Sequence, residues 1–178
     1  MSATLPPPAS RLSPLRKHTL AVLVNNESGV LARVVGLFSG RGYNIESLTV
    51  SEVDAVEGIS RITIVTIGTD QIVEQIKAQL GRLVPVYRVA DLTASGALVE
   101  HELALIKIAG TADTLQKARR IAEDFAAREV DSTSTSFIIE MTGEPEKINE
   151  LVVALQLLGL VEVVRTGVVA ITRGATPL

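Results

Sequence analysis

The spacing of hydrophobic and polar residues changes several times along the first half of the chain, and each change predicts a new strand or helix. Runs rich in Val, Ile and Thr are typical of strands, whereas apolar residues three and four apart are typical of a helix. Gly40, Gly42 and Pro85 end the helical runs. The predicted elements are strands at 19–24, 45–53, 59–67 and 84–92, with helices at 29–39 and 70–83. This order predicts a ferredoxin-like sheet with two helices on one face.

The same order recurs in the second half, after a short segment at 94–101 that we interpret as a linker. The predicted elements are strands at 102–109, 136–142, 160–164 and 168–172, a short strand near Val130, and helices at 115–125 and 144–158. The expected fold class is therefore α+β, with two tandem ferredoxin-like (βαββαβ) domains, each an antiparallel sheet with helices on one face. The expected domains are 17–93 and 102–174, flanked by a proline-rich disordered arm at 1–16 and a tail at 175–178.

Composition excludes several kinds of chemistry. The 178 residues include no cysteine and only two histidines, which rules out disulfides, thiol nucleophiles and cysteine-based metal sites. A net charge of -3 argues against a nucleic-acid-binding protein, which is normally basic. No run of 18 apolar residues occurs, so we expect no membrane helix. The expected location is the cytoplasm, and a plastid transit peptide is the less favoured interpretation of the arginine-poor arm.

No arrangement of residues typical of an enzyme occurs. The chain has no Gly-x-Ser-x-Gly nucleophile turn, no Walker phosphate-binding motif and no Gly-x-Gly-x-x-Gly dinucleotide fingerprint. His18 and His101 have no obvious partners, and we interpret both as surface histidines. The acidic residues Glu144 and Glu146 suit the start of a helix. We therefore predict no catalytic residues, no metal site and no cofactor bound by this chain.

The most concentrated signal lies between the first predicted strand and the first predicted helix, at residues 25–31. The first turn of a helix has unpaired N–H groups and a partial positive charge, which suit a carboxylate, and Gly29 lets a ligand approach this backbone. The amides of Asn26 and Asn44 can serve the carboxylate or the ammonium group of an amino acid. The alternative interpretation is local: Asn and Ser side chains cap the helix and glycine makes the turn, with no ligand.

Three strings of residues in this region resemble a known family. The letters NESGVLARV at 26–34, GLFS at 36–39 and RGYNIESL at 41–48 are similar to the ACT domain of the small, regulatory subunit of acetohydroxyacid synthase (acetolactate synthase). The string RGYNIESL is specific to that family, whereas other ACT domains share only the Gly-Val-Leu portion. The run GVVAITRG at 167–174 extends the similarity to the second half.

The resemblance implies a regulator of branched-chain amino acid biosynthesis that is not itself a catalyst. It would bind a large catalytic subunit, which carries thiamine diphosphate, Mg and FAD, raise its activity, and make it sensitive to feedback inhibition by valine or a related amino acid. The effector would lie where two ACT domains pair side by side in a homodimer. The resemblance places the effector site at Asn26, Gly29, Val30 and Leu31 of one chain and at Asn44 and Ile45 of the facing chain.

Two other functions fit parts of this pattern. A free-standing ACT sensor that regulates a different enzyme would share the effector site, but neither the family-specific string nor the second domain. An RNA-binding module would share the strand order, but it needs aromatic residues on its central strands, and these strands contain almost none.

Overall fold

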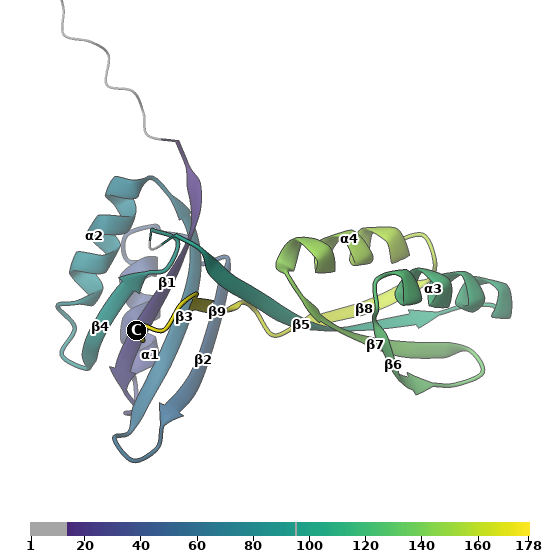
Figure 1. The fold of residues 1–178 in the computed structure, drawn as a ribbon, viewed down its shortest axis with the longest axis horizontal. Helices are drawn as coiled ribbons and strands as arrows, with labels where there is room; N and C mark the ends of the chain where they lie inside the picture. The colour runs from purple at the N-terminus through teal and green to yellow at the C-terminus, as the bar shows by residue number, and fades with distance from the viewer. Residues whose placement is uncertain (1–13, 95) are drawn as a thin grey trace, which may run out of the picture.

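The structure, a computed structural model, describes residues 14–94 and 96–178, so most of the arm predicted at 1–16 lies outside the described residues. Two domains lie side by side along the long axis of the molecule (Figure 1). The first contains β1 (Arg16–Asn25), α1 (Val30–Ser39), β2 (Ser47–Asp54), β3 (Ile59–Gly68), α2 (Asp70–Leu80) and β4 (Val86–Asp91). The second contains β5 (Leu98–Ala109), α3 (Ala112–Asp124), β6 (Arg128–Ser132), β7 (Ser136–Gly143), α4 (Pro145–Leu155) and β8 (Leu160–Arg165), and is followed by β9 (Val169–Thr172).

The first domain is a four-stranded antiparallel sheet in the order β2-β3-β1-β4. Side chains alternate between the two faces of a strand, so Leu20 and Val22 of β1 point the same way. They share a buried cluster with Val34 of α1 and with Val73 and Ile76 of α2. Both helices therefore cover this one face of the sheet (Figure 1).

The second domain repeats this arrangement, with its strands in the equivalent order β6-β7-β5-β8. Its buried cluster joins Ile106 of β5 and Phe137 of β7 to Leu115 of α3 and Leu151 of α4. The α+β fold class with two ferredoxin-like domains is confirmed. No helix of the described residues covers the opposite face of this sheet, and Leu105 and Val164 are exposed there.

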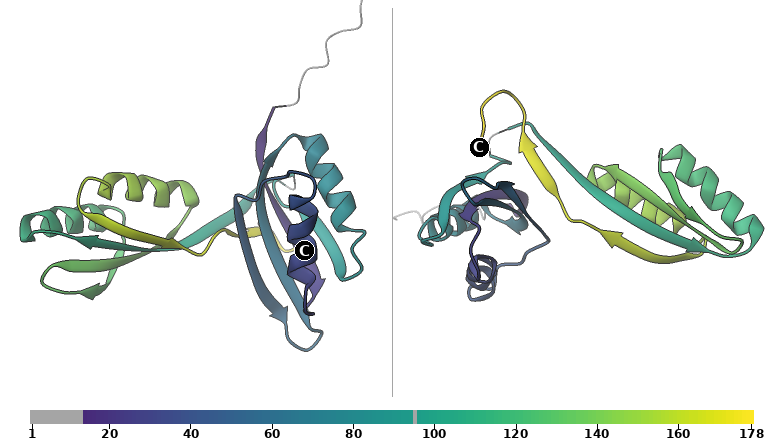
Figure 2. Two further views of the ribbon diagram at one scale, coloured as in Figure 1. Left: turned by 180° about the vertical axis from the view of Figure 1, so that it is seen from behind. Right: turned by 90° about the horizontal axis from the view of Figure 1, so that it is seen from below.

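The opposite face of the first sheet is covered by a two-stranded ribbon. The start of β5 pairs antiparallel with β9, with Leu98 opposite Thr172, and Figure 2 shows these two segments running side by side from one domain to the other. One side of the ribbon contributes to a second buried cluster, which includes Ala21 of β1 and Val65 of β3. β1 is consequently buried on both faces, as its continuous apolar run predicts.

The ribbon changes two of the expected boundaries. Residues 98–101, expected to lie in a linker at 94–101, form the start of β5. β9, expected to belong with the domain at 102–174, packs against the first domain instead. The physical reason is that the outer face of the first sheet is apolar and needs a second layer to exclude water. Arg61 of β3 adds a hydrogen bond of 2.7 Å from Nη2 to the carbonyl oxygen of Ala170, and burial lowers the pKa of its guanidinium.

The interpretation of His18 as a surface residue is wrong. The exposed fraction of His18 is 5%, and its Nδ1 lies 3.0 Å from Oδ2 of Asp91, which is also buried. A carboxylate accepts but does not donate hydrogen bonds, so Nδ1 is the donor. Nε2 lies 3.6 Å from Oδ1 of Asp70 at the start of α2. His18 thus joins three elements of the first domain, whereas His101 is exposed as predicted.

We expect His18→Ala to lower the free energy of unfolding by about 2 kcal/mol, because it removes a buried hydrogen bond to a charged group. The matched control is His101→Ala, at the exposed histidine, which should change the free energy by less than about 0.5 kcal/mol. Urea denaturation followed by circular dichroism measures both. Equal effects of the two substitutions would contradict a structural role for the His18–Asp91 pair.

Candidate functional site

Helix α1 begins without a side-chain cap. Gly29 occupies the N-cap position with φ of 84°, a left-handed conformation that favours glycine, and no side chain bonds to the first-turn N–H groups. In contrast, α2 and α3 are capped by the hydroxyl groups of Thr69 and Thr111. Capping by Asn and Ser, one part of the alternative interpretation, is therefore wrong, whereas glycine does make the turn, as that interpretation expects. The backbone N–H of Val30 donates to the carbonyl of Glu27 over 3.3 Å, so a ligand with acceptor atoms would meet the N–H groups that follow it in the first turn.

The predicted residues around this turn have different environments. Asn26 is exposed; its backbone N–H donates to the carbonyl of Gly58 over 2.7 Å, and its Nδ2 donates to Glu52 over 3.0 Å. Leu31 is exposed, whereas Val30 is buried in the first domain's main core. A ligand at this turn would consequently meet the backbone of Val30 and the side chains of Asn26 and Leu31.

Asn44 and Ile45 follow the other end of α1. The helix has ten residues, which at 1.5 Å per residue makes it about 15 Å long. Nδ2 of Asn44 donates to Glu46, and its carbonyl oxygen accepts a hydrogen bond of 2.6 Å from Oγ1 of Thr66 on β3. Ile45 is half-buried against the main core of the first domain. One chain therefore does not bring the two predicted groups together, and the shared site in a pair of chains stays a prediction.

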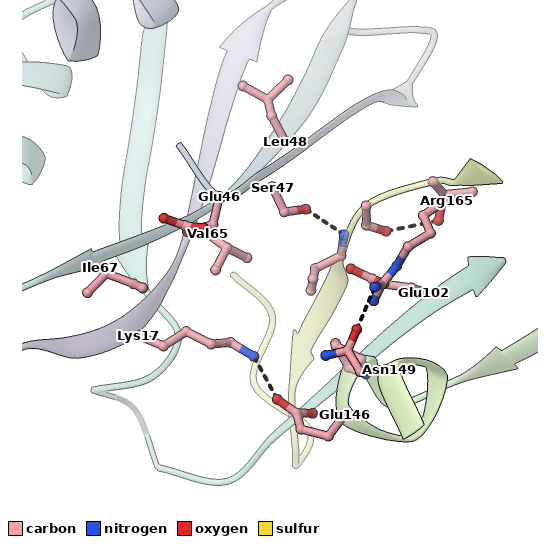
Figure 3. A pocket seen from close by; sticks show the side chains of 14 residues that line it. Lys17, Glu46, Ser47, Leu48, Val65, Ile67, Glu102, Glu146, Asn149 and Arg165 are labelled. Carbon is pink, nitrogen blue, oxygen red and sulfur yellow. Dashed lines mark hydrogen bonds and ion pairs between the residues drawn. The ribbon is translucent and has the colours of Figure 1, made fainter. Parts of the chain in front are cut away.

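A separate cavity of about 590 Å³ lies between the two domains (Figure 3). The residues of the first domain that line it are Lys17, Glu46, Ser47, Leu48, Val65 and Ile67. The second domain contributes Glu102, Pro145, Glu146, Asn149, Arg165 and Thr166, and the segment just before β9 contributes Gly167 and Val168. Some of these residues belong to the strings that carry the family resemblance, RGYNIESL at 41–48 and GVVAITRG at 167–174, but no residue of the cavity was predicted to line a site. They lie on six separate segments and include charged types that are common on any surface, so no single motif predicts that they meet.

The charged groups around this cavity are paired with one another. Nε and Nη2 of Arg165 donate to the buried carboxylate of Glu102, and Nη1 donates to Oδ1 of Asn149 over 2.6 Å. Nζ of Lys17 lies 2.7 Å from Glu100 and 3.6 Å from Glu146 (Figure 3). Burial lowers the pKa of Lys17, but the two carboxylates more than offset this and raise it overall. The cavity is therefore a polar joint between domains, whose main charges are already neutralised.

Within residues 14–94 and 96–178, no three His, Asp or Glu side chains gather in a way that could hold a metal ion. Over the same residues, no helix is long and apolar enough to cross a bilayer.

Comparison with known proteins places the chain in a family. A family model described as an AHAS small subunit-like ACT domain matches residues 20–88, and one described as the small subunit of acetolactate synthase matches residues 101–174. The two matches correspond to the two domains of the fold, apart from the shared ribbon.

Individual relatives agree over most of their length. The chain is 44% identical over 158 residues to a probable acetolactate synthase small subunit of Archaeoglobus fulgidus, which covers 89% of this chain and 98% of that protein. It is 43% identical to the acetolactate synthase isozyme 3 small subunit of Salmonella typhimurium, over 89% of this chain and 96% of that one. The crystal structure of an acetolactate synthase small subunit from Thermotoga maritima matches with a TM-score of 0.82 and 36% identity, covering 90% of this chain and 99% of that chain. The chain belongs to the family of acetolactate synthase small subunits.

Proposed function

We propose that this chain is a regulatory subunit that binds the thiamine-diphosphate-dependent catalytic subunit of acetolactate synthase and raises its activity. We further propose that it makes the enzyme sensitive to feedback inhibition by valine or a related branched-chain amino acid. The observation that carries the second part is the uncapped start of α1 at Gly29, in a chain that belongs to this family.

The chemistry of the α1 start suits the α-carboxylate of an amino acid. The helix N-terminus carries a partial positive charge and N–H groups that no side chain caps. A Cβ built on Gly29 would meet no other atom within 4 Å, so space for a ligand lies beside this backbone. The amide of Asn26 is exposed next to it and offers both a donor and an acceptor.

The apolar part of the effector would need Leu31 from one chain and Ile45 from another. Leu31 is exposed and Ile45 is half-buried, so their side chains can still lose surface to an aliphatic ligand. Because the two groups lie at opposite ends of α1, a single site that uses both requires a pair of ACT domains. An apolar pocket discriminates a single methylene by only about 1–3 kcal/mol, so valine, leucine and isoleucine are all candidate effectors.

The proposal is tested by mixing the purified catalytic subunit with this chain and measuring acetolactate formation. We expect a rise in activity on addition of this chain, and a fall when valine is then added. Calorimetry of valine with this chain alone, and its mass by light scattering, test effector binding and pairing separately. Valine binding without any effect on the catalytic subunit would instead favour a free-standing amino-acid sensor.

A further inference from the structure

One residue of the chain that leaves the second domain is hydrogen-bonded to the first domain through both of its backbone groups. The backbone N–H of Val168 donates to Oγ of Ser47 over 2.8 Å, and the carbonyl oxygen of Val168 accepts from Oγ1 of Thr49, also over 2.8 Å. Ser47 and Thr49 are two positions apart on β2, so their side chains share one face of the strand. We call this arrangement the Val168 clamp. It fixes the chain that leaves the second domain onto the first.

The residue before the clamp cannot be anything but glycine without rearrangement. Gly167 has φ of 86°, and a Cβ built on it would lie 2.8 Å from Oγ of Ser47 and 3.2 Å from Cγ2 of Thr49. Real Cβ atoms do not approach other atoms so closely, and a side chain at this φ is strained as well. The first domain and this backbone are therefore in direct contact.

The residue on the other side of Gly167 belongs to the second domain. The backbone N–H of Thr166 donates to the carbonyl of Leu103 over 3.1 Å, and the N–H of Leu103 donates back to Oγ1 of Thr166 over 3.1 Å. Thr166 is thus held by β5 within the second sheet, whereas Val168 is held by β2 of the first. Only Gly167 lies between the two attachments. On this returning strand, one residue lies between the two attachments, whereas β5 crosses beside it as a continuous strand, paired with β9 at His101 and with β7 at Glu102, so a change of domain orientation about Gly167 also bends β5.

The same strand β2 begins beside the predicted effector residues. Asn44 and Ile45 lie immediately before Glu46, whose N–H donates to the carbonyl of Val65 over 2.8 Å, and Ser47 is next. Three peptide bonds join Asn44 to Ser47, so a ligand that displaced the Asn44 loop would move Ser47 as well, in a packed structure with little slack. Figure 3 shows Ser47 at the edge of the interdomain cavity, with its hydroxyl directed toward the chain that leaves the second domain.

We propose that the Val168 clamp carries the effect of an amino acid bound at the first domain to the second domain, by setting the orientation of the two domains about Gly167. This inference rests on the proposed function, because it concerns the regulation of that effector site. Ser47 and Thr49 act as positioning residues and do not contact the effector. The Lys17–Glu146 contact on the far side of the cavity is largely exposed, so it adds little resistance to such a movement.

The test removes the two hydroxyl groups while keeping the size of the side chains, in the double variant Ser47→Ala, Thr49→Val. The isolated variant should bind valine with a Kd within about twofold of the wild-type value, since the effector residues are intact. In the reconstituted enzyme, the valine concentration for half-inhibition should rise at least about tenfold, because the coupling between sites is lost. Two controls are the single variants Ser51→Ala, at an exposed serine further along β2, and Thr49→Ser, which removes a methyl group but keeps the hydroxyl that bonds to Val168. Both should remain inhibited as the wild type is.

Hydrogen exchange at the amide of Val168 gives a second readout that does not depend on the catalytic subunit. In the wild-type chain, valine should change the exchange rate of this amide, and in the double variant it should not.

A double variant that binds valine and is inhibited normally would overturn the inference while leaving the proposed function intact. A wild-type chain that does not bind valine would overturn the proposed function and the inference with it. A double variant that neither binds valine nor retains the wild-type circular dichroism spectrum would also overturn the inference, because the two hydroxyl groups would then be needed for the fold of the first domain and not for coupling alone.

Discussion

The Gly29→Asp protein is expected to bind valine at least about 100-fold more weakly than the wild-type chain, because a carboxylate would lie where the carboxylate of the effector binds. The substituted side chain has room, since a Cβ at Gly29 meets no atom within 4 Å, so the fold should persist. Calorimetry with the isolated chain measures the Kd. Urea denaturation checks that the loss of binding is not a loss of structure.

The matched control for this substitution is Gly29→Asn. Asparagine has nearly the same size and faces the same φ of 84°, and it tolerates the left-handed region about as well as aspartate, but it carries no charge. We expect its loss of affinity to be about tenfold smaller, and the difference between the two variants to shrink as salt screens the charge. An equal loss in both variants at all salt concentrations would mean that bulk or backbone strain is responsible. Unchanged binding by Gly29→Asp would remove this turn from the effector site.

The Gly159→Ala protein is expected to lose about 4 kcal/mol or more of the free energy of unfolding, which is exceptional for a single methyl group. Gly159 has φ of 78°, and a Cβ built on it would lie 2.0 Å from the carbonyl oxygen of Ala109. This oxygen belongs to the backbone, so it cannot move aside as a flexible side chain could. The N–H of Ala109 also donates to the carbonyl of Gly159 over 2.9 Å, which holds the end of β5 in place. The start of β8 would have to separate from β5.

Gly42→Ala is the control variant, because it carries the cost of a positive φ without the steric clash. Gly42 has φ of 69°, but a Cβ there meets no atom within 4 Å, so only the conformational cost of about 1–2 kcal/mol applies. Urea denaturation followed by circular dichroism compares the two variants. Hydrogen exchange should locate the loss in the second domain for Gly159→Ala. Similar destabilisation of both variants would show that the packing of Gly159 against Ala109 has no special role.

The sequence predicts the strand and helix order well where one face of each element is apolar, but it misplaces some ends. The helical pattern extends to Leu83, yet α2 ends at Leu80 with Gly81 as its cap, and likewise α4 ends at Leu155 rather than at Leu158. Leu83 and Leu158 still pack against the cores from the turns that follow. An apolar residue at helical spacing therefore indicates burial, and burial does not require that the helix continue.

At the candidate site too, the sequence predicts features that depend on neighbouring residues and misses contacts between distant ones. The string around Gly29 predicts the turn and the family, because these depend on residues that are neighbours in sequence, whereas the sequence left open whether Asn or Ser caps the helix, and the structure has no such cap. The environment of His18 was not predictable, since its partner Asp91 is 73 residues away and any acidic residue would have looked equivalent. The separation of Gly29 from Asn44 was predictable, because the sequence places a helix between them, and α1 is that helix.

By itself, the sequence determined the two α+β units, the apolar face of each helix and the family-specific turn before α1, because local periodicity and local backbone chemistry specify them. The tertiary structure alone decided that β9 returns to the first domain, that Lys17 and Arg165 face one cavity, and that Ser47 holds the peptide unit of Val168. Ser47 and Val168 are 121 residues apart. Contacts over such a distance depend on how two finished sheets bury their remaining apolar faces, and no pattern within either segment records the partner.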